Sequence, residues 1–263
     1  MNGGPDMPDS RPWLAAVRSS HDRLTALMTG LSPAEVAAPS YASEWSLAQV
    51  LSHLGSQAEL FWLLLEAGFS GGAAPGQETM RPIWERWDAL PPAVQVSASV
   101  DANERLVRRF ESLDAAQISA FHVSAFGREM DFVGLLRARL SEHAIHTWDV
   151  AVALDASAVL APDAAALLVD YLPEMAARVG KPAARPATLA VSTTDPERHF
   201  TLATGGVHLE PRTEQVTSGF LRLPAEALFR LVYGRLDPAH TPALLLSSPA
   251  VTLDDLRSVF PGF

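Results

Sequence analysis

A chain of 263 residues is longer than one small hydrophobic core usually holds, so the length by itself predicts two domains. Hydrophobic residues make up 48% of the sequence and charged residues 19%, a balance that excludes wholesale disorder. The formal net charge is −10 and basic residues form no cluster, so nucleic acid is not an expected partner.

The chain contains no cysteine, which excludes disulfides, thiolate metal sites and a nucleophilic sulfur of its own. The first ten residues are polar and turn-rich, without the cationic start and apolar stretch of a signal peptide. No apolar run approaches the roughly 20 residues that cross a bilayer. We therefore expect a disordered segment over residues 1–10 in a cytoplasmic protein that does not enter membranes.

The first half of the chain has the periodicity of bundle helices. Apolar residues recur at helical spacing over residues 14–31, with His21 on the same stripe. A second helix begins after Trp45-Ser46, where Ser46 and Gln49 form a capping-box pattern, and we expect it to end at Gly68.

Two more helices follow after a break. Residues 70–79 are rich in glycine and are expected to form a loop. Helical periodicity returns at Asp101, and a fourth long helix is expected over about Phe132 to Leu154. Four long helices with long connections predict a four-helix bundle over residues 11–158.

The pattern changes near residue 156, and residues 159–263 are expected to form an α+β domain with helices on one face of a small sheet. A helix is expected near residues 162–179. An amphipathic helix should follow Pro224 and close at Gly234, and the last residues should hold a buried strand and a final helix. A hairpin is expected at Gly205-Gly206. Runs of strand character cover residues 187–194, 199–204, 206–210 and 215–223.

The fourth bundle helix carries a row of polar side chains among apolar ones. Glu142 and His146 are four residues apart and share one helix face, which Arg139 and Asp149 extend in both directions. Burial of such a row is costly without partners, so the row is expected to face water, a cavity or an ion.

A histidine of the second helix completes a candidate metal site. In a bundle, His53 would converge with Glu142 and His146 to give three ligands and an open fourth position, as in catalytic zinc sites. The plain alternative is a solvated Glu–His pair. His143 with His146 is a competing pair, but His143 points about 100° away from Glu142. His21 is expected to be a core histidine with one partner.

Two motifs together carry a family resemblance. The segment from Trp45 to Leu54, followed some ninety residues later by the E-x-x-x-H-x-x-D pattern of residues 142–149, resembles the mycothiol-dependent maleylpyruvate isomerase family. That family belongs to the DinB-like group of metal-binding four-helix bundles. The resemblance covers nearly the whole chain and implies a small sterol-carrier-like α+β domain after the bundle.

The resemblance implies a divalent metal, usually zinc, held by His53, Glu142 and His146. It also implies mycothiol, a low-molecular-weight thiol, as the nucleophile that a chain without cysteine must take from outside. A bound divalent cation favours thiolate over thiol at neutral pH.

Further roles are expected for residues near these ligands. Trp45, Gln57 and Trp148 are expected to bind the thiol cofactor or wall the site. Asp149 and Arg139 are expected to take part in catalysis, Asp149 by holding a ligand imidazole in one tautomer and Arg139 by pairing with Glu142 or an anionic substrate; the alternative for Arg139 is a surface ion pair. Gly234-Arg235 matches a Gly-Arg pair of similar proteins, so Arg235 is expected to bind a carboxylate or polar group. The alternative for Arg235 is a basic residue that complements the end of its helix.

The sequence therefore predicts a metal- and thiol-dependent enzyme that acts on a small, acidic or electrophilic metabolite. Cis-trans isomerisation of a maleylpyruvate-type substrate and S-transfer to an electrophile remain equal alternatives. The rival hypothesis is a non-catalytic module that binds a metal or small molecule. In such a module a fourth protein ligand, such as His21 or Asp149, would close the metal site.

Overall fold

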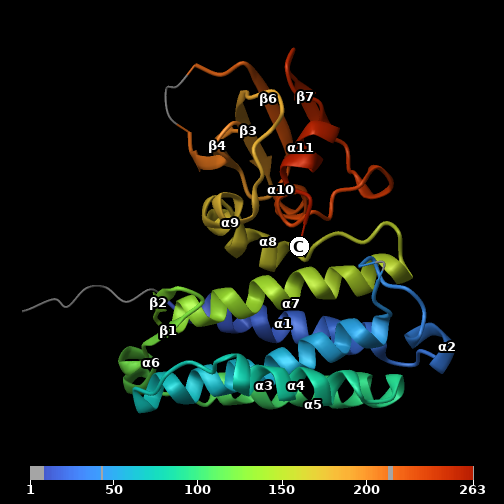
Figure 1. Ribbon diagram of the computed structural model, residues 1–263, viewed down its shortest axis with the longest axis vertical. Coiled ribbons are helices and arrows are strands. Elements are labelled where there is room, and N and C mark those ends of the chain that lie inside the picture. The colour runs from blue at the N-terminus through green and yellow to red at the C-terminus, as the bar shows by residue number, and fades with distance from the viewer. Residues whose placement is uncertain (1–8, 43, 213–215, 263) are drawn as a thin grey trace, which may run out of the picture. The chain divides into compact units, whose positions relative to one another are not determined.

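The computed structural model describes residues 9–42, 44–212 and 216–262, and the chain divides after Ala156 into two compact units (Figure 1). Most of the segment expected to be disordered, residues 1–8, lies outside the described residues. The first helix begins at Arg11, directly after that segment. The two units are described separately below.

Four long helices build the first unit, as expected. They are α1 (Arg11–Met28), α3 (Leu47–Ser70), α5 (Pro92–Glu111) and α7 (Phe132–Leu154) (Figure 1). Helix α3 packs on α5 and on α7, while α1 packs on α7 and on α5, which closes a ring of four. The contact between α3 and α7 brings together the two helices that carry the candidate metal ligands. The shorter elements of this unit are α2 (Pro33–Val36), α4 (Gln77–Asp88), α6 (Ala115–Ala120), β1 (Val123–Ala125) and β2 (Arg128–Met130).

The start of α3 follows the predicted capping box. The Ser46 hydroxyl accepts a hydrogen bond from the backbone N–H of Gln49, and the Gln49 side-chain oxygen accepts one from the backbone N–H of Ser46. The expected end at Gly68 is wrong, because α3 continues to Ser70 and closes at Gly71 with a φ of 63°. A Cβ on Gly68 would lie 2.2 Å from the ring of Phe121, so this glycine serves close packing.

Two parts of the bundle differ from the sequence expectation. Helix α4 begins at Gln77, inside the stretch expected to be a loop, and buries only Ile83 and Trp87 around an internal Pro82. Helix α5 begins at Pro92 and not near Asp101. Hydrophobic periodicity does not reveal the first half of α5, because its buried face is small or polar, at positions such as 95, 99 and 102.

The second unit is an α+β domain, as expected. Among its described residues, five strands lie in the order β5-β4-β3-β6-β7, with β3 and β6 parallel and the other pairs antiparallel. Helices α9 and α10 pack on the sheet, and every residue of α10 is buried. The strands are β3 (Thr188–Thr194), β4 (Arg198–Ala203), β5 (His208–Pro211), β6 (Gly219–Pro224) and β7 (Leu245–Ser247). The helices are α8 (Pro162–Leu168), α9 (Leu172–Val179), α10 (Ala225–Val232) and α11 (Leu253–Val259), with 3-10 turns η1 (Val169–Tyr171) and η2 (Pro238–His240).

Several elements of this unit can be compared with those expected from the sequence. The hairpin at Gly205-Gly206 joins β4 to β5, and α10 ends just before Gly234, both as predicted. The single helix expected over 162–179 is interrupted by η1, because Pro173 has no N–H and its ring clashes with the carbonyl four residues earlier. Strand β7 is an edge strand whose first and last residues are exposed and whose middle residue is partly buried, so the expectation of a buried strand is wrong. Gln215, where the last strand run was expected to begin, lies outside the described residues.

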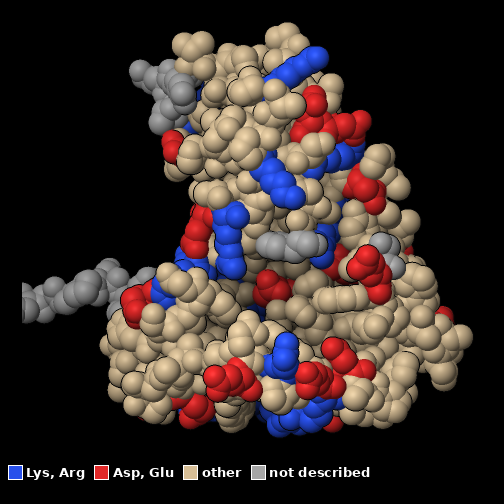
Figure 2. Space-filling model, viewed as in Figure 1, with Lys and Arg blue, Asp and Glu red and all other residues tan. Residues whose placement is uncertain are grey.

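The surface agrees with the charge pattern of the sequence. On the face shown in Figure 2, lysine and arginine side chains are interspersed with aspartate and glutamate and do not gather into one basic region. No helix in the described part of the chain is long and apolar enough to cross a membrane.

Candidate metal centre

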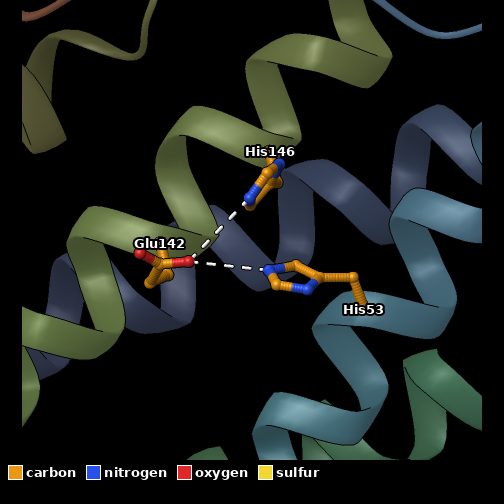
Figure 3. A group of neighbouring side chains, drawn as sticks. All are labelled: His53, Glu142 and His146. Atoms are coloured by element: carbon orange, nitrogen blue, oxygen red, sulfur yellow. Dashed lines mark ion pairs between the residues drawn. The ribbon is translucent and has the colours of Figure 1, made fainter. Parts of the chain in front are cut away.

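Three side chains from two helices converge inside the bundle. His53 comes from α3, and Glu142 and His146 come from α7 (Figure 3). Glu142 Oε2 lies 3.6 Å from His53 Nε2 and 3.8 Å from His146 Nε2, and the three ligand atoms all lie within 4.8 Å of one another. Ligands about 2 Å from a tetrahedral zinc ion are about 3.4 Å apart, so the group fits a cation after small movements.

The protonation states of the cluster also suit a metal. Burial lowers the pKa of His53 below its usual value, although the Glu142 carboxylate acts in the opposite direction. Burial by itself raises the pKa of Glu142, but the interactions with His53, His146 and Gln57 bring it down to about 2. At neutral pH His53 is therefore neutral and Glu142 ionised, which are the forms that bind divalent ions.

Asp149 orients one of the two imidazoles. His146 Nδ1 lies 2.9 Å from Asp149 Oδ2, and the Asp149 side chain is completely buried one turn further along α7. A carboxylate at this distance accepts the Nδ1 proton, so Nε2 of His146 is left as the acceptor that faces Glu142. Carboxylate–histidine pairs of this kind support the ligands of many metal sites.

Arg139 acts on the cluster through Gln57. Arg139 Nη1 donates to Gln57 Oε1 at 2.9 Å, and Nη2 donates to the Leu54 carbonyl at 3.2 Å and to Asn103 Oδ1. A guanidinium has only donors, so the Gln57 amide must turn its oxygen toward Arg139 and its NH₂ group toward the cluster. Gln57 Nε2 then donates to Glu142 Oε2 at 2.8 Å.

A cavity of about 740 Å³ opens beside His53 and Gln57. Trp45 forms part of its wall, with its ring centroid 5.2 Å from that of His53 and 6.2 Å from that of His146. The other walls come from α3, α4 and the tip of the β1–β2 hairpin. Their large apolar side chains are Leu60, Phe61, Leu64, Met80, Trp84 and Phe126.

No fourth His, Asp or Glu of the described residues joins the three-ligand group. Asp149 is engaged with His146 Nδ1, and His21 lies in the core with its Nε2 3.2 Å from Glu104. The closing ligands suggested for a non-catalytic module are thus used elsewhere. His143 is buried on another side of α7, where its Nδ1 contacts the Ser20 hydroxyl at 2.8 Å.

Two expected site residues lie apart from this group. Trp148 is 2% exposed, packs against the ring of Tyr41 and is not among the described residues that line the cavity. Its ring faces the core, and its expected contact with a cofactor stays a prediction. Arg235 belongs to the second unit, where its Nη1 donates to the Tyr233 carbonyl at the end of α10. That contact matches the alternative of a basic residue at a helix end, and its catalytic role stays a prediction.

Two features of the site were not expected from the sequence: Asn103 as a partner of Arg139, and the part of the cavity wall that comes from α4 and the β1–β2 hairpin. The sequence gives only a weak indication for Asn103: it is a polar residue on the same helix face as the apolar Leu106 and Phe110. Met80 and Trp84 were missed because α4 itself was not expected. Phe126 lies at the tip of a hairpin of two short strands, for which the sequence analysis found no signal.

Comparisons with known proteins agree with this architecture. The family model described as the mycothiol maleylpyruvate isomerase N-terminal domain matches residues 17–151. No curated protein sequence matches the chain. A crystal structure of the mycothiol-dependent maleylpyruvate isomerase superposes with a TM-score of 0.66 at 15% identity, covering 91% of this chain and 93% of that one.

Two further structures are similar. A histidine-to-alanine mutant of the same isomerase has a TM-score of 0.64 at 15% identity and covers 86% of this chain and 90% of its own. YfiT from Bacillus subtilis, described as a probable metal-dependent hydrolase with a four-helix bundle, has a TM-score of 0.45 at 11% identity, with 58% and 91% covered. At these identities the isomerase structures establish a shared fold for nearly the whole chain.

Proposed function

The chain belongs to the mycothiol maleylpyruvate isomerase N-terminal domain family, and from this premise we propose that it is a metal-dependent enzyme that uses mycothiol as its nucleophile. The observation that carries the proposal is the open group of His53, Glu142 and His146 at the edge of a cavity. A closed structural site would surround its ion with a fourth protein ligand.

The residues present fit a divalent cation, with zinc the first choice for two imidazoles and a carboxylate. A cation held there would lower the pKa of a thiol at the open position, so that the thiolate is available at neutral pH. The chain supplies no cysteine, so the sulfur must come from a small molecule.

Each neighbouring side chain has a positioning role in this proposal. Asp149 fixes the ring of His146, and Arg139 fixes the amide of Gln57 with its NH₂ group toward the cluster. Trp45 stands beside both imidazoles and limits the access of water. Gln57 and Trp45 are the side chains placed to contact the thiol, because both line the cavity next to His53.

Two reactions use this arrangement. In isomerisation, the thiolate adds to one carbon of a cis double bond, and the π electrons move to the conjugated carbonyl as an enolate. After rotation about the single bond, the enolate electrons return, the C–S bond breaks and the sulfur leaves as the thiolate that began the cycle. In S-transfer the C–S bond remains, while a leaving group departs with its electron pair or a proton completes the addition.

Metal content tests the site itself. We expect about one divalent ion per chain in protein purified without chelators, and close to none in His53→Ala, because the variant loses one of only three protein ligands. Elemental analysis measures both. The matched control is His122→Ala, which removes an exposed histidine outside the cluster and should leave the content unchanged. A metal-free wild type, or a His53→Ala variant that keeps its ion, would contradict the proposal.

Incubation with mycothiol and candidate electrophiles tests the chemistry. Mass spectrometry distinguishes S-transfer, in which a thiol adduct accumulates, from isomerisation, in which the substrate changes geometry and the thiol is regenerated. Both should depend on His53. Activity that is equal without added thiol would show that the nucleophile is something else.

A further inference from the structure

The cavity beside the metal cluster has an unusual charge balance for a site that receives acids. Neither lysine nor arginine is among the described residues that line it. Besides His53 of the cluster and the indole of Trp45, its polar lining consists of Gln49, Ser56 and Gln57, which are uncharged, and of Asp88, an exposed carboxylate on α4. A carboxylate that entered this space would lose hydration and meet a like charge without a cationic partner.

Arg139, the cationic side chain next to the cluster, already has hydrogen-bond partners. Arg139 is 1% exposed and lies behind Gln57, where its guanidinium donates to Gln57, the Leu54 carbonyl and Asn103 and stands over the ring of Phe61. Glu142 and an ionised thiol would together offset the two positive charges of a divalent ion. Little net positive charge is then left to attract an acid.

The walls of the cavity are instead suited to the apolar part of a ligand. Phe61 and Phe126 approach with ring centroids 6.4 Å apart, and Trp84 and Met80 from α4 complete this side. Phe126 is 56% exposed and has a φ of +54°, because Phe126 and Gly127 form the two-residue turn of the β1–β2 hairpin, which favours positive φ at both positions. The hairpin turn thus holds the aromatic ring out at the cavity. A volume of about 740 Å³ lies within the range of pockets for drug-sized ligands.

We propose that this cavity binds neutral electrophiles with an aromatic or extended apolar body, and that it discriminates against dicarboxylates. The inference rests on the proposed function and names its substrate class. The apolar body lies against Phe61, Trp84 and Phe126, and the reactive carbon faces the open side of the cluster. Conjugation forms a C–S bond, expels the leaving group with its bonding electron pair and releases the thiol proton to solvent.

A matched pair of compounds tests the selectivity without any catalysis. Methyl 3,5-dinitrobenzoate and free 3,5-dinitrobenzoate share the same ring, carry no leaving group and differ by one negative charge. Calorimetric titration at neutral pH of the full chain, as purified and in the presence of saturating mycothiol, measures their binding with the thiol present, as the charge argument requires. We expect the ester to bind at least about tenfold more tightly than the carboxylate.

Two variants locate the effect. Asp88→Asn removes the carboxylate of the lining and should strengthen binding of the free benzoate, so that the ratio between the two compounds narrows several-fold. Glu85→Gln makes the same charge change on the same helix outside the lining and should leave the ratio unchanged. Phe126→Ser should weaken binding of the ester by about tenfold, because it removes a large apolar wall.

Equal or tighter binding of the carboxylate would overturn the inference, as would an ester affinity that Phe126→Ser leaves unchanged. These outcomes are independent of the proposed function. A protein that binds metal and consumes mycothiol but prefers the carboxylate refutes the inference alone. A protein without metal or thiol activity that still selects the ester refutes only the proposed function.

Discussion

The imidazole of His146 shows how single residues decide what the cluster can bind. A histidine offers either nitrogen to a metal, and the partner of the other nitrogen decides which one remains free. Here the buried carboxylate of Asp149 lies 2.9 Å from Nδ1, so Nε2 faces Glu142 and His53. The same carboxylate makes the ring a better electron donor. Asp149 is therefore a positioning residue of the candidate metal centre.

Replacement of this carboxylate tests its role. We expect Asp149→Asn to weaken zinc binding by about 10- to 100-fold, because the amide keeps the shape of the side chain but loses the charge that supports His146. Competition with a chromophoric chelator measures the affinity, and circular dichroism checks that the helices persist. Asp101→Asn, an exposed aspartate on α5, is the matched control. An unchanged affinity in Asp149→Asn would exclude the role.

At the scale of elements, the position of α4 decides whether a cavity exists at all. This helix supplies Met80 and Trp84 to the wall and anchors itself on α3 through Trp87. The ring of Trp87 lies directly on Gly55, where an added Cβ would be 2.3 Å away, and its Nε1 donates to Glu59 at 3.0 Å. Gly55 is thus required for the close approach of α4 to the helix that carries His53.

A methyl group at Gly55 should disturb this contact. We expect Gly55→Ala to lower the free energy of unfolding by about 1–3 kcal/mol, because the buried Trp87 ring has to move. Chemical denaturation measures the change. Gly72→Ala, an exposed glycine whose nearest contact is the hydroxyl of Ser70, should differ from wild type by about 0.5 kcal/mol or less. Equal stability of the two variants would contradict the prediction, because it would mean that α4 can move away from α3 without lowering the free energy of unfolding.

On the scale of the whole bundle, two histidines buried between α1 and α7 link stability to pH. His21 is 4% exposed and His143 1%, and their rings lie 6.4 Å apart between α1 and α7. Burial lowers the pKa of His21, and it lowers the pKa of His143 further, to well below the usual value, with Arg139 adding to the effect. Both imidazoles are therefore protonated less readily in the folded bundle than in the unfolded chain.

This linkage predicts the sign of the pH dependence. In the unfolded chain both histidines take up protons below about pH 6.5, whereas in the folded chain they do so only at lower pH. The contribution of these two histidines to the free energy of unfolding is therefore fully present above about pH 6.5 and decreases as the pH falls. The slope is at most about 1.4 kcal/mol per pH unit for each histidine. Urea denaturation of metal-free protein between pH 7 and 5 should show a smaller slope for His21→Gln than for wild type. The exposed His122→Gln is the control, and an identical slope in His21→Gln would contradict the prediction.

The fold was predicted best where one physical signal was strong. The capping box of Ser46 and Gln49 and the continuous helical pattern of α7 located two site helices, because these signals are local. Helix α4 and the start of α5 were missed, since a short helix around Pro82 and a polar buried face have little periodicity. The end at Gly68 was misjudged because the same residue type serves both helix ends and close packing.

By itself, the sequence determined the absence of a protein thiol, the bundle followed by an α+β half, and three candidate ligands at spacings that two helices can bring together. Residue types and periodicity are local properties, and they are sufficient for these conclusions. Only the tertiary structure decided that α3 and α7 are neighbours, that Trp148 faces the core, and that the adjoining cavity is lined without a lysine or arginine among the described residues. These features depend on which faces pack together, and packing is decided by contacts between residues far apart in the chain.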